Sequence, residues 1–289
     1  MLNGKTIIVT GGTNGIGEVS ALELARAGAE VIVISRSKDK CAATVQKIQS
    51  ETGNKNVSYI AADLSTLAGI RSAAEQFLSQ HSKLHVLLNN AGGVFTSRQV
   101  TADGYEMTFA LNHLSYFLLT HLLINTLKAT AASEGDARVV NVSSSAHFMA
   151  RGVDLDDLQR KKNFNRFGVY SETKLMNVLF TNELSKRLQG TNVTANSLHP
   201  GLVRSGFGKN NGGIIPMLFS MIQIFGISAQ QGAQTSIYLA SSPEVKGITG
   251  KYWDKKKVTT PSVPAQDTAA QEKLWRISEE LTHIAPVKV

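Results

Sequence analysis

Short apolar runs alternate with amphipathic segments along the first 200 residues of the chain. The runs are rich in β-branched residues, which is typical of strands. They predict strands at 6–10, 30–35, 57–63, 84–90, 138–144 and 192–200. The segments between them carry apolar residues at helical spacing, and they predict helices at about 14–28, 39–51, 66–80, 112–130 and 167–189. This alternation predicts an α/β fold, a doubly wound parallel sheet with helices on both faces.

No repeat or linker divides the chain, so a single Rossmann-like domain is expected over residues 1–289. Residues 201–228 depart from the alternation and predict a substrate lid at the edge formed by the carboxyl ends of the strands, where ligands of such sheets bind. Methionine and phenylalanine are frequent there, as in 214–227. They could line a bulky apolar ligand, bury against the body of the protein or touch a lipid surface.

Composition and charge narrow the range of partners. The net charge is +8, but the basic residues are scattered, and the clusters at 160–162 and 255–257 have no interleaved aromatics. No nucleic-acid partner is therefore expected. The single cysteine, Cys41, fits a reducing compartment, and no leader precedes the first strand, so an intracellular, cytoplasmic location is expected. Three dispersed histidines lack metal-ligand spacing and predict no metal site: His113, His147 and His199.

A glycine-rich turn, GGTNGIG, joins the first strand to the first helix. Gly11, Gly15 and Gly17 lie where the chain must turn sharply, admit a ligand to the backbone and pack the helix closely. The helix N-terminus offers free N–H groups and a positive dipole end to a pyrophosphate. Because of its place in a doubly wound pattern, this turn predicts dinucleotide binding rather than an ordinary loop.

The end of the second strand indicates which dinucleotide binds. The strand ends in VISRS, with Ser35 and Arg36 where an NAD site carries a carboxylate for the ribose 2′-hydroxyl. A guanidinium could instead bind a 2′-phosphate, so NADP(H) is the predicted cofactor, with a solvated arginine as the alternative. Asp63, after the third strand, could cap the next helix or accept the adenine amino group.

Tyr170 and Lys174 are four residues apart in GVYSETKLMN, so a helix would place them on one face. A phenol could protonate a carbonyl oxygen during hydride transfer, but its ordinary pKa of about 10 is high for neutral pH. An ammonium about 4 Å away stabilises a phenolate by about 4 kcal/mol at an effective dielectric constant of about 20, and by only about 1 kcal/mol in bulk water. The pair is therefore expected to be reactive in a partly dry site. An exposed aromatic beside a solvated lysine is the alternative.

Several motifs occur in the order and approximate spacing of one enzyme family. They are TGGTNGIG at 10–17, NNAG at 89–92, Asn112 in ALNHLSYFLLT, the serines of VVNVSSSAH, Tyr170 with Lys174, and HPG at 199–201. The chain resembles the short-chain dehydrogenase/reductase family over nearly its whole length. Its retinol-dehydrogenase-like branch is similar in the loop before YSETKLMN and in the segments NHLSYFLLT, VNVSSSAH, LHPGLVRS, QGAQTSIYLA and LWRISEELT.

The resemblance implies a catalytic set of four residues. They are Asn112, Ser144, Tyr170 and Lys174. Tyr170 would be the general acid and base, Ser144 would hold the substrate oxygen, and Asn112 would position a water that links the lysine to solvent. Ser143 and Ser145 are the rivals of Ser144, and a helix cap is the alternative use of Asn112.

The implied cofactor contacts lie mainly in residues 1–145, with others on the catalytic helix at 167–189 and after the last strand. They are Gly11, Thr13, Asn14, Gly15, Ile16, Gly17, Arg36, Asp63, Leu64, Asn90, Ala91, Gly92, Tyr170, Lys174, Pro200, Gly201 and Val203.

The sequence departs from the family pattern in two places. Thr173 precedes the lysine where the family often has serine, which keeps a hydroxyl and adds a methyl group. Membrane-bound members of the branch carry an apolar N-terminal anchor, whereas this chain begins directly at its first strand. That difference places a membrane location in doubt.

The expected function is an NADP(H)-dependent oxidoreductase that interconverts a lipophilic alcohol and its carbonyl, such as a retinoid, an aldehyde or a steroid, in the reductive direction. The alternative is a nucleotide-binding regulatory or scaffold protein with little turnover. A sugar-nucleotide epimerase fits less well, because only some 90 residues follow position 200. Peripheral membrane contact is left open. A homo-oligomer is also left open, because helices 112–130 and 170–188 could pair between subunits or cover the sheet.

Overall fold

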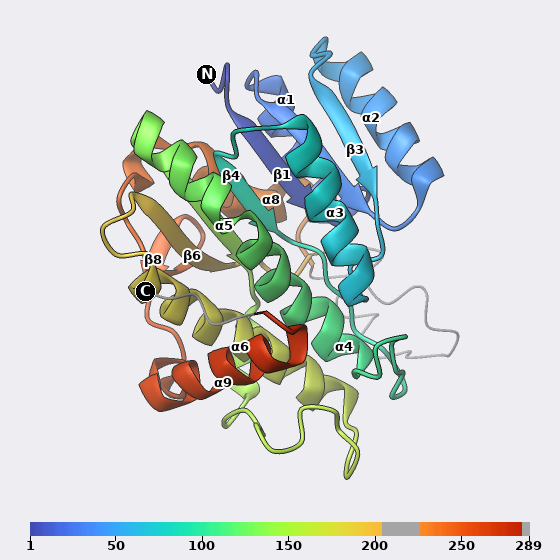
Figure 1. Ribbon diagram of the computed structural model, residues 1–289, viewed down its shortest axis with the longest axis vertical. Coiled ribbons are helices and arrows are strands. Elements are labelled where there is room, and N and C mark those ends of the chain that lie inside the picture. The colour runs from blue at the N-terminus through green and yellow to red at the C-terminus, as the bar shows by residue number, and fades with distance from the viewer. Residues whose placement is uncertain (204–225, 285–289) are drawn as a thin grey trace.

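The computed structural model describes residues 1–203 and 226–284, and within them the strands form one eight-stranded sheet of order β3-β2-β1-β4-β5-β6-β7-β8 (Figure 1). Neighbouring strands are parallel except for the antiparallel pair β7 and β8. The strands are β1 Thr6–Thr10, β2 Glu30–Ser35, β3 Val57–Ala61, β4 Val86–Asn89, β5 Ala137–Val142, β6 Val193–His199, β7 Tyr252–Asp254 and β8 Lys257–Thr259. The predicted doubly wound α/β fold is confirmed.

Helices cover both faces of the sheet because successive strand residues point to opposite sides. In β1, Ile7 and Val9 pack with the helices of one layer, and Ile8 packs with those of the other. The first layer contains α1 Gly15–Arg26, α2 Lys38–Thr52 and α8 Ala229–Ser241. The second layer, at the front of Figure 1, contains α3 Leu67–Gln80, α5 Ser115–Glu134 and α6 Arg166–Arg187.

The helix α9, Thr268–Thr282, packs across the outer side of α6. Its buried Trp275 contacts Phe117 of α5 and Phe180 of α6, with ring centroids 5.1 and 5.8 Å apart. Part of the apolar surface that could have paired two subunits is thus covered within the same chain. Among the described residues, only the segment Met107–Glu134 is long and apolar enough to cross a membrane, and 78% of its most apolar window is buried, as in a core helix.

The long helix of the second layer starts earlier than the sequence predicted. A single turn, α4 Met107–Phe109, leads through the π-helical turn η1 Ala110–Leu114 into α5. Glu106 begins it, because its carboxylate accepts hydrogen bonds from the amides of Thr108 and Phe109 at 3.0 and 2.7 Å. Gly135, with a φ of 76°, ends α5 in the left-handed conformation.

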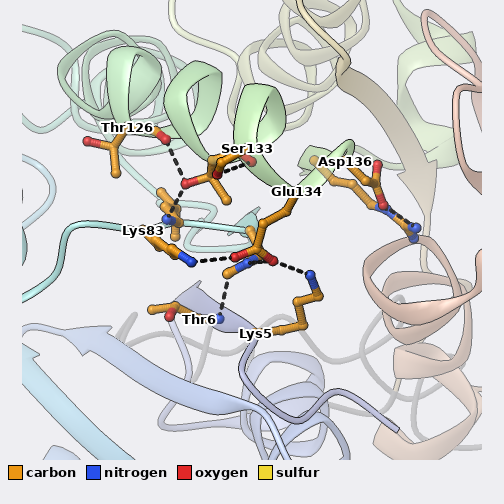
Figure 2. A network of polar contacts seen from close by, with 11 residues as sticks. Lys5, Thr6, Lys83, Thr126, Ser133, Glu134 and Asp136 are labelled. Atoms are coloured by element: carbon orange, nitrogen blue, oxygen red, sulfur yellow. Dashed lines mark hydrogen bonds and ion pairs between the residues drawn. The ribbon is translucent and has the colours of Figure 1, made fainter.

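The amino-terminal edge of the sheet is tied to the end of α5 by a polar network around Glu134 (Figure 2). The Glu134 carboxylate accepts from Lys5 Nζ at 2.5 Å, Lys83 Nζ at 2.7 Å and His85 Nε2 at 2.8 Å. His85 Nδ1 in turn accepts from the amide of Thr6 at 2.9 Å. The hydrogen bonds from Lys5, Lys83 and His85 hold the pKa of Glu134 well below its ordinary value of 4.5.

Replacing Glu134 by glutamine should therefore destabilise the protein at pH 7 by about 1–2 kcal/mol, measured by urea unfolding. The depressed pKa means that the stabilisation is present above pH 4.5 and is lost as the pH falls towards the folded-state pKa. The difference between wild type and variant should accordingly shrink below pH 4.5. Glu75→Gln is the matched control, since Glu75 is exposed and has no ion pair with another described residue. An equal loss in both variants would contradict the role of the network.

Candidate active site

The carboxyl ends of β1, β4, β5 and β6 meet at one edge of the sheet, because these strands are parallel neighbours. The glycine-rich turn follows β1, Gly92 follows β4, the 3-10 helix η2 Ser145–Met149 follows β5, and Pro200 follows β6. This edge is where ligands of doubly wound sheets bind.

The glycine-rich turn leaves no room for side chains at two of its glycines. A Cβ on Gly11, whose φ is +65°, would lie 2.9 Å from the Cα of Ala91. A Cβ on Gly17 would lie 2.3 Å from the carbonyl oxygen of Gly11. Asn14 is the N-cap of α1, but its side chain makes no capping hydrogen bond. Glycine backbone and uncapped amides at a helix N-terminus fit a pyrophosphate.

Asn90 and Ala91 hold this turn against the end of β4. The Asn90 side chain donates to the Thr10 carbonyl at 2.8 Å, and the amide of Ala91 donates to Thr10 Oγ1 at 3.0 Å. The Asn90 side chain therefore supports the turn instead of facing outward. Thr13, within the turn, shares a 3.0 Å hydrogen bond with Ser35 at the end of β2.

Arg36, directly after β2, is exposed. In the part of the chain that the structure describes, no hydrogen bond or ion pair occupies its guanidinium. It lies next to Ser35, whose hydroxyl is bonded to Thr13 of the glycine-rich turn. An anionic group beyond the turn could therefore reach Arg36 without displacing a protein partner.

Asp63 does not cap the next helix, so that use was wrong. Its Oδ1 accepts from the amide and the hydroxyl of Ser65 at 3.0 and 2.7 Å. The cap of α3 is Thr66, whose hydroxyl accepts from the amide of Gly69 at 3.1 Å. The contact of Asp63 with an adenine stays a prediction. The side chain of Leu64 is buried in the core, which leaves its backbone for such a contact.

Ser144 is the serine that faces Tyr170. Its side chain hydrogen-bonds the Tyr170 phenol and accepts from the amide of Ala146 at 3.1 Å. The Ser143 hydroxyl instead donates to the backbone carbonyl of Lys174 at 2.7 Å, and Ser145 is exposed. The three serines left open by the sequence are thus in different environments.

Lys174 is 4% exposed, and its ammonium donates to the carbonyl of Val142 at 3.0 Å. The same nitrogen lies 5.7 Å from the centroid of the Tyr170 ring. Burial lowers the pKa of Lys174 to about 7. Desolvation raises the pKa of the half-buried Tyr170 to about 12, against a smaller opposite effect of the Ser144 hydrogen bond. The expected lowering of the phenol pKa by the lysine is thus not met in this structure, because desolvation is the largest effect on the phenol.

Asn112 lies in η1, fully buried, rather than at the start of a helix, so the helix-cap alternative was wrong. The side-chain oxygen of Asn112 accepts from the backbone N–H of Gly93 at 2.8 Å. Its side-chain nitrogen donates to the Gly93 carbonyl at 2.9 Å and to Thr173 Oγ1 at 3.0 Å. A Cβ on Gly92 would lie 3.1 Å from Asn112 Oδ1 and 3.6 Å from the Lys174 ammonium. The structure therefore brings the segment after β4, Asn112 and the Tyr170 helix together.

Most of the predicted lid lies outside the described residues, and so do residues 214–225 of its apolar segment 214–227. The base of the lid is described: Gly201 has a φ of +91°, and Val203 pairs with Ile227 in an isolated bridge. A Cβ on Gly232 of α8 would lie 2.4 Å from the Val203 side chain and 3.3 Å from that of Ile16. Val203, at the start of the predicted lid, therefore lies close to the glycine-rich turn.

Four exposed apolar side chains lie close in sequence to the predicted catalytic and cofactor-binding residues, and three of them, Phe148, Met149 and Phe167, were not predicted. They lie on η2, on the first turn of α6 and after Gly201: Phe148, Met149, Phe167 and Leu202. Their exposed fractions are 52%, 73%, 37% and 53%. The available signal was an aromatic or methionine directly after the serine strand and before Tyr170.

The short chain dehydrogenase family model matches residues 5–212. The human protein retinol dehydrogenase 13 is 41% identical over 285 residues, which cover 96% of this chain and 84% of that protein. The crystal structure of an uncharacterized protein from Mycobacterium Paratuberculosis is 30% identical with a TM-score of 0.78, covering 98% of this chain and 95% of that one. The Pseudomonas aeruginosa RhlG/NADP active-site complex is 26% identical with a TM-score of 0.70, covering 87% and 94%. The chain therefore belongs to the short-chain dehydrogenase family of oxidoreductases, in which it is similar to the retinol dehydrogenases.

Proposed function

We propose that the protein is an NADP(H)-dependent oxidoreductase that interconverts a lipophilic alcohol and its carbonyl, with Tyr170 as the general acid and base. The observation that carries this proposal is the hydrogen bond between the Tyr170 phenol and the Ser144 side chain, one helical turn from the buried Lys174. A nicotinamide cofactor would supply or accept the hydride. A scaffold protein has no use for a buried lysine, whose desolvation opposes folding.

Tyr170 and Ser144 have different roles at the substrate oxygen. Ser144 donates a hydrogen bond that holds the oxygen beside the phenol, and Tyr170 delivers the proton as the oxygen becomes negative. A pKa of about 12 keeps the Tyr170 phenol protonated at neutral pH. The protonated phenol is the form that donates in the reduction, and the phenolate is the base that the oxidation needs.

Lys174 and Asn112 would act on Tyr170 and on its proton supply. The Lys174 nitrogen lies 5.7 Å from the centroid of the Tyr170 ring, and a charge at about that distance stabilises a phenolate by about 3 kcal/mol at an effective dielectric constant of about 20. Asn112 is fixed by Gly93 and Thr173 and lies beside the lysine, where it would orient a water for proton exchange with solvent. Thr173, in the place of the family serine, supplies its hydroxyl to this arrangement.

The substrate class follows from the apolar surroundings of the site. Phe148, Met149, Phe167 and Leu202 expose apolar side chains within a few residues of Ser144, Tyr170 and Gly201 in the sequence. Exposed apolar groups beside a reactive centre suit a substrate with a large hydrocarbon body. The similarity to a protein named retinol dehydrogenase 13 supports the same class.

The test is NADPH consumption by the purified protein with retinal, medium-chain aldehydes, quinones and keto-steroids, with NADH measured alongside. Turnover that is dependent on Tyr170 and prefers NADPH is the expected result, with the highest kcat/KM for the most lipophilic carbonyls. NADPH binding without turnover of any carbonyl would favour the scaffold alternative.

Arg36→Ala should raise the KM for NADPH about 10- to 100-fold and leave the KM for NADH within about twofold. The reason is that a guanidinium–phosphate pair contributes about 1.5–3 kcal/mol to binding. NADH has no 2′-phosphate, so its binding does not include this contribution. Steady-state kinetics with both coenzymes measure the ratio. Lys55→Ala is the control, because Lys55 is an exposed cation ahead of β3, at the opposite edge of the sheet. An equal change for both coenzymes would overturn the assignment of Arg36.

A further inference from the structure

His147, on η2, is fully buried and uses both of its ring nitrogens. Nδ1 lies 2.7 Å from the carbonyl oxygen of Ser144, and Nε2 lies 3.1 Å from the backbone nitrogen of Ser262. A carbonyl oxygen can only accept and a backbone N–H can only donate. Nδ1 must therefore carry the hydrogen and Nε2 must be bare, which defines one neutral tautomer.

The ring of His147 is held in this orientation by its neighbours. It packs against the rings of Phe148 and of Tyr252 on β7, with centroids 4.1 and 4.6 Å away. Burial lowers the pKa of His147, so the neutral form persists at neutral pH. The imidazole is thus a fixed bridge between two backbone groups that are 118 residues apart in the chain.

The far end of the bridge is anchored in the C-terminal part of the chain. Ser262 leads into the 3-10 helix η4 Val263–Gln266, in which Ala265 is fully buried. The Ala265 carbonyl accepts from the side chains of Asn182 on α6 and Gln271 on α9, both at 3.1 Å. The position of Ser262 is therefore fixed by the packing of η4 against α6 and α9. Ser262 lies outside the residues matched by the family model.

The near end of the bridge is the backbone of the serine that faces Tyr170. A second histidine fixes the next peptide, because the amide of Ser145 donates to His199 Nδ1 at 3.0 Å. The Ser144 hydroxyl can contact Tyr170 only while its backbone keeps this position. A shift of about 1 Å at such a group lowers a rate about 100-fold.

We propose that His147 is a positioning residue for Ser144, and that the backbone amide of Ser262 belongs to the active site through it. This inference rests on the proposed role of Ser144 in the reduction. His147 itself touches neither substrate nor cofactor.

The test breaks the bridge without changing a side chain that touches substrate or cofactor. Ser262 has a φ of −58°, which proline adopts, so Ser262→Pro removes the N–H that faces His147 and puts the proline Cδ in its place, which displaces the His147 ring from the bridge. Val263→Pro is the matched control: it places proline at the first position of η4, Val263 is 82% exposed, and its amide bonds to no described residue. We expect kcat to fall about 10- to 100-fold in Ser262→Pro, with NADPH affinity and KM unchanged. Val263→Pro should retain wild-type kcat.

A double-mutant cycle separates positioning from general support of the fold. In a Ser144→Ala background, Ser262→Pro should cause no further fall in kcat, because the group that it positions is absent. An equal fall in both backgrounds, or wild-type kcat in Ser262→Pro, would overturn the proposal. If Ser262→Pro does not fold, His147→Phe, which keeps an aromatic ring, carries the same cycle. Absence of Tyr170-dependent turnover in the wild type would instead refute the proposed function, so the two failures are distinguishable.

Discussion

Replacing Tyr170 by phenylalanine should lower kcat/KM for carbonyl reduction about 100- to 10,000-fold, the usual contribution of a positioned proton donor. The ring stays in place, but the hydroxyl that bonds Ser144 and supplies the proton is gone. The loss should fall on kcat, since the proposed NADPH contacts lie mainly in the glycine-rich turn after β1. Single-turnover oxidation of bound NADPH measures the step directly.

The control for this variant is another phenol with a similar hydrogen bond. Tyr238 on α8 bonds Glu244 through its hydroxyl at 2.8 Å, away from the catalytic residues in sequence and in the sheet. Tyr238→Phe should keep wild-type kcat/KM, and NADPH fluorescence should report equal affinity in all three proteins. A Tyr170→Phe enzyme with more than a tenth of wild-type activity would exclude Tyr170 as the proton donor.

Lys174→Met should lower kcat/KM about 100-fold and at the same time raise the stability of the protein. The activity falls because the positive charge 5.7 Å from the centroid of the Tyr170 ring is lost, and a charge at about that distance stabilises a phenolate by about 3 kcal/mol. The stability rises because burial lowers the lysine pKa from 10.5 to about 7. That difference destabilises the folded state at pH 7 by about 4 kcal/mol, offset by about 1 kcal/mol for the hydrogen bond to Val142.

The effect of Lys174 on the stability of the protein depends on pH. A lysine with a depressed folded-state pKa is destabilising below pH 7, and the effect disappears as the pH rises to 10.5. Urea unfolding should therefore show the Lys174→Met variant more stable at pH 7 and equal to wild type near pH 10.5. Lys55→Met at an exposed position should show neither change. A variant less stable than wild type at pH 7 would mean that the ammonium is better solvated than its burial indicates.

The parallel part of the sheet could be predicted from the sequence because each strand is a run of β-branched residues between turn signals. The edge strands β7 and β8 could not. Each has three residues, too few for a periodic pattern. The hairpin between them turns at Lys255 and Lys256, with φ of 48° and 63°, whereas such turns usually contain asparagine or glycine.

The helix that carries Tyr170 and Lys174 and the glycine-rich turn were predictable because each lies in a local motif, although their contacts with Val142 and Asn90 are long-range. The surroundings of Asn112 were not, because they depend on a π-helical turn that gives no sequence signal and on Thr173, 61 residues away. The raised pKa of Tyr170 depends on desolvation by the whole fold. The contacts of His147 were not predictable either, because its partner Ser262 is 115 residues away in the sequence.

The β7–β8 hairpin also affects how molecules of this protein meet one another. β8 is the last strand of the sheet, it is exposed throughout, and its outer backbone groups could in principle pair with a strand of another molecule. Lys255, Lys256 and Lys257 place three positive charges at this point. A second copy that approached edge to edge would bring like charges together, so the lysines protect the open end of the sheet from aggregation.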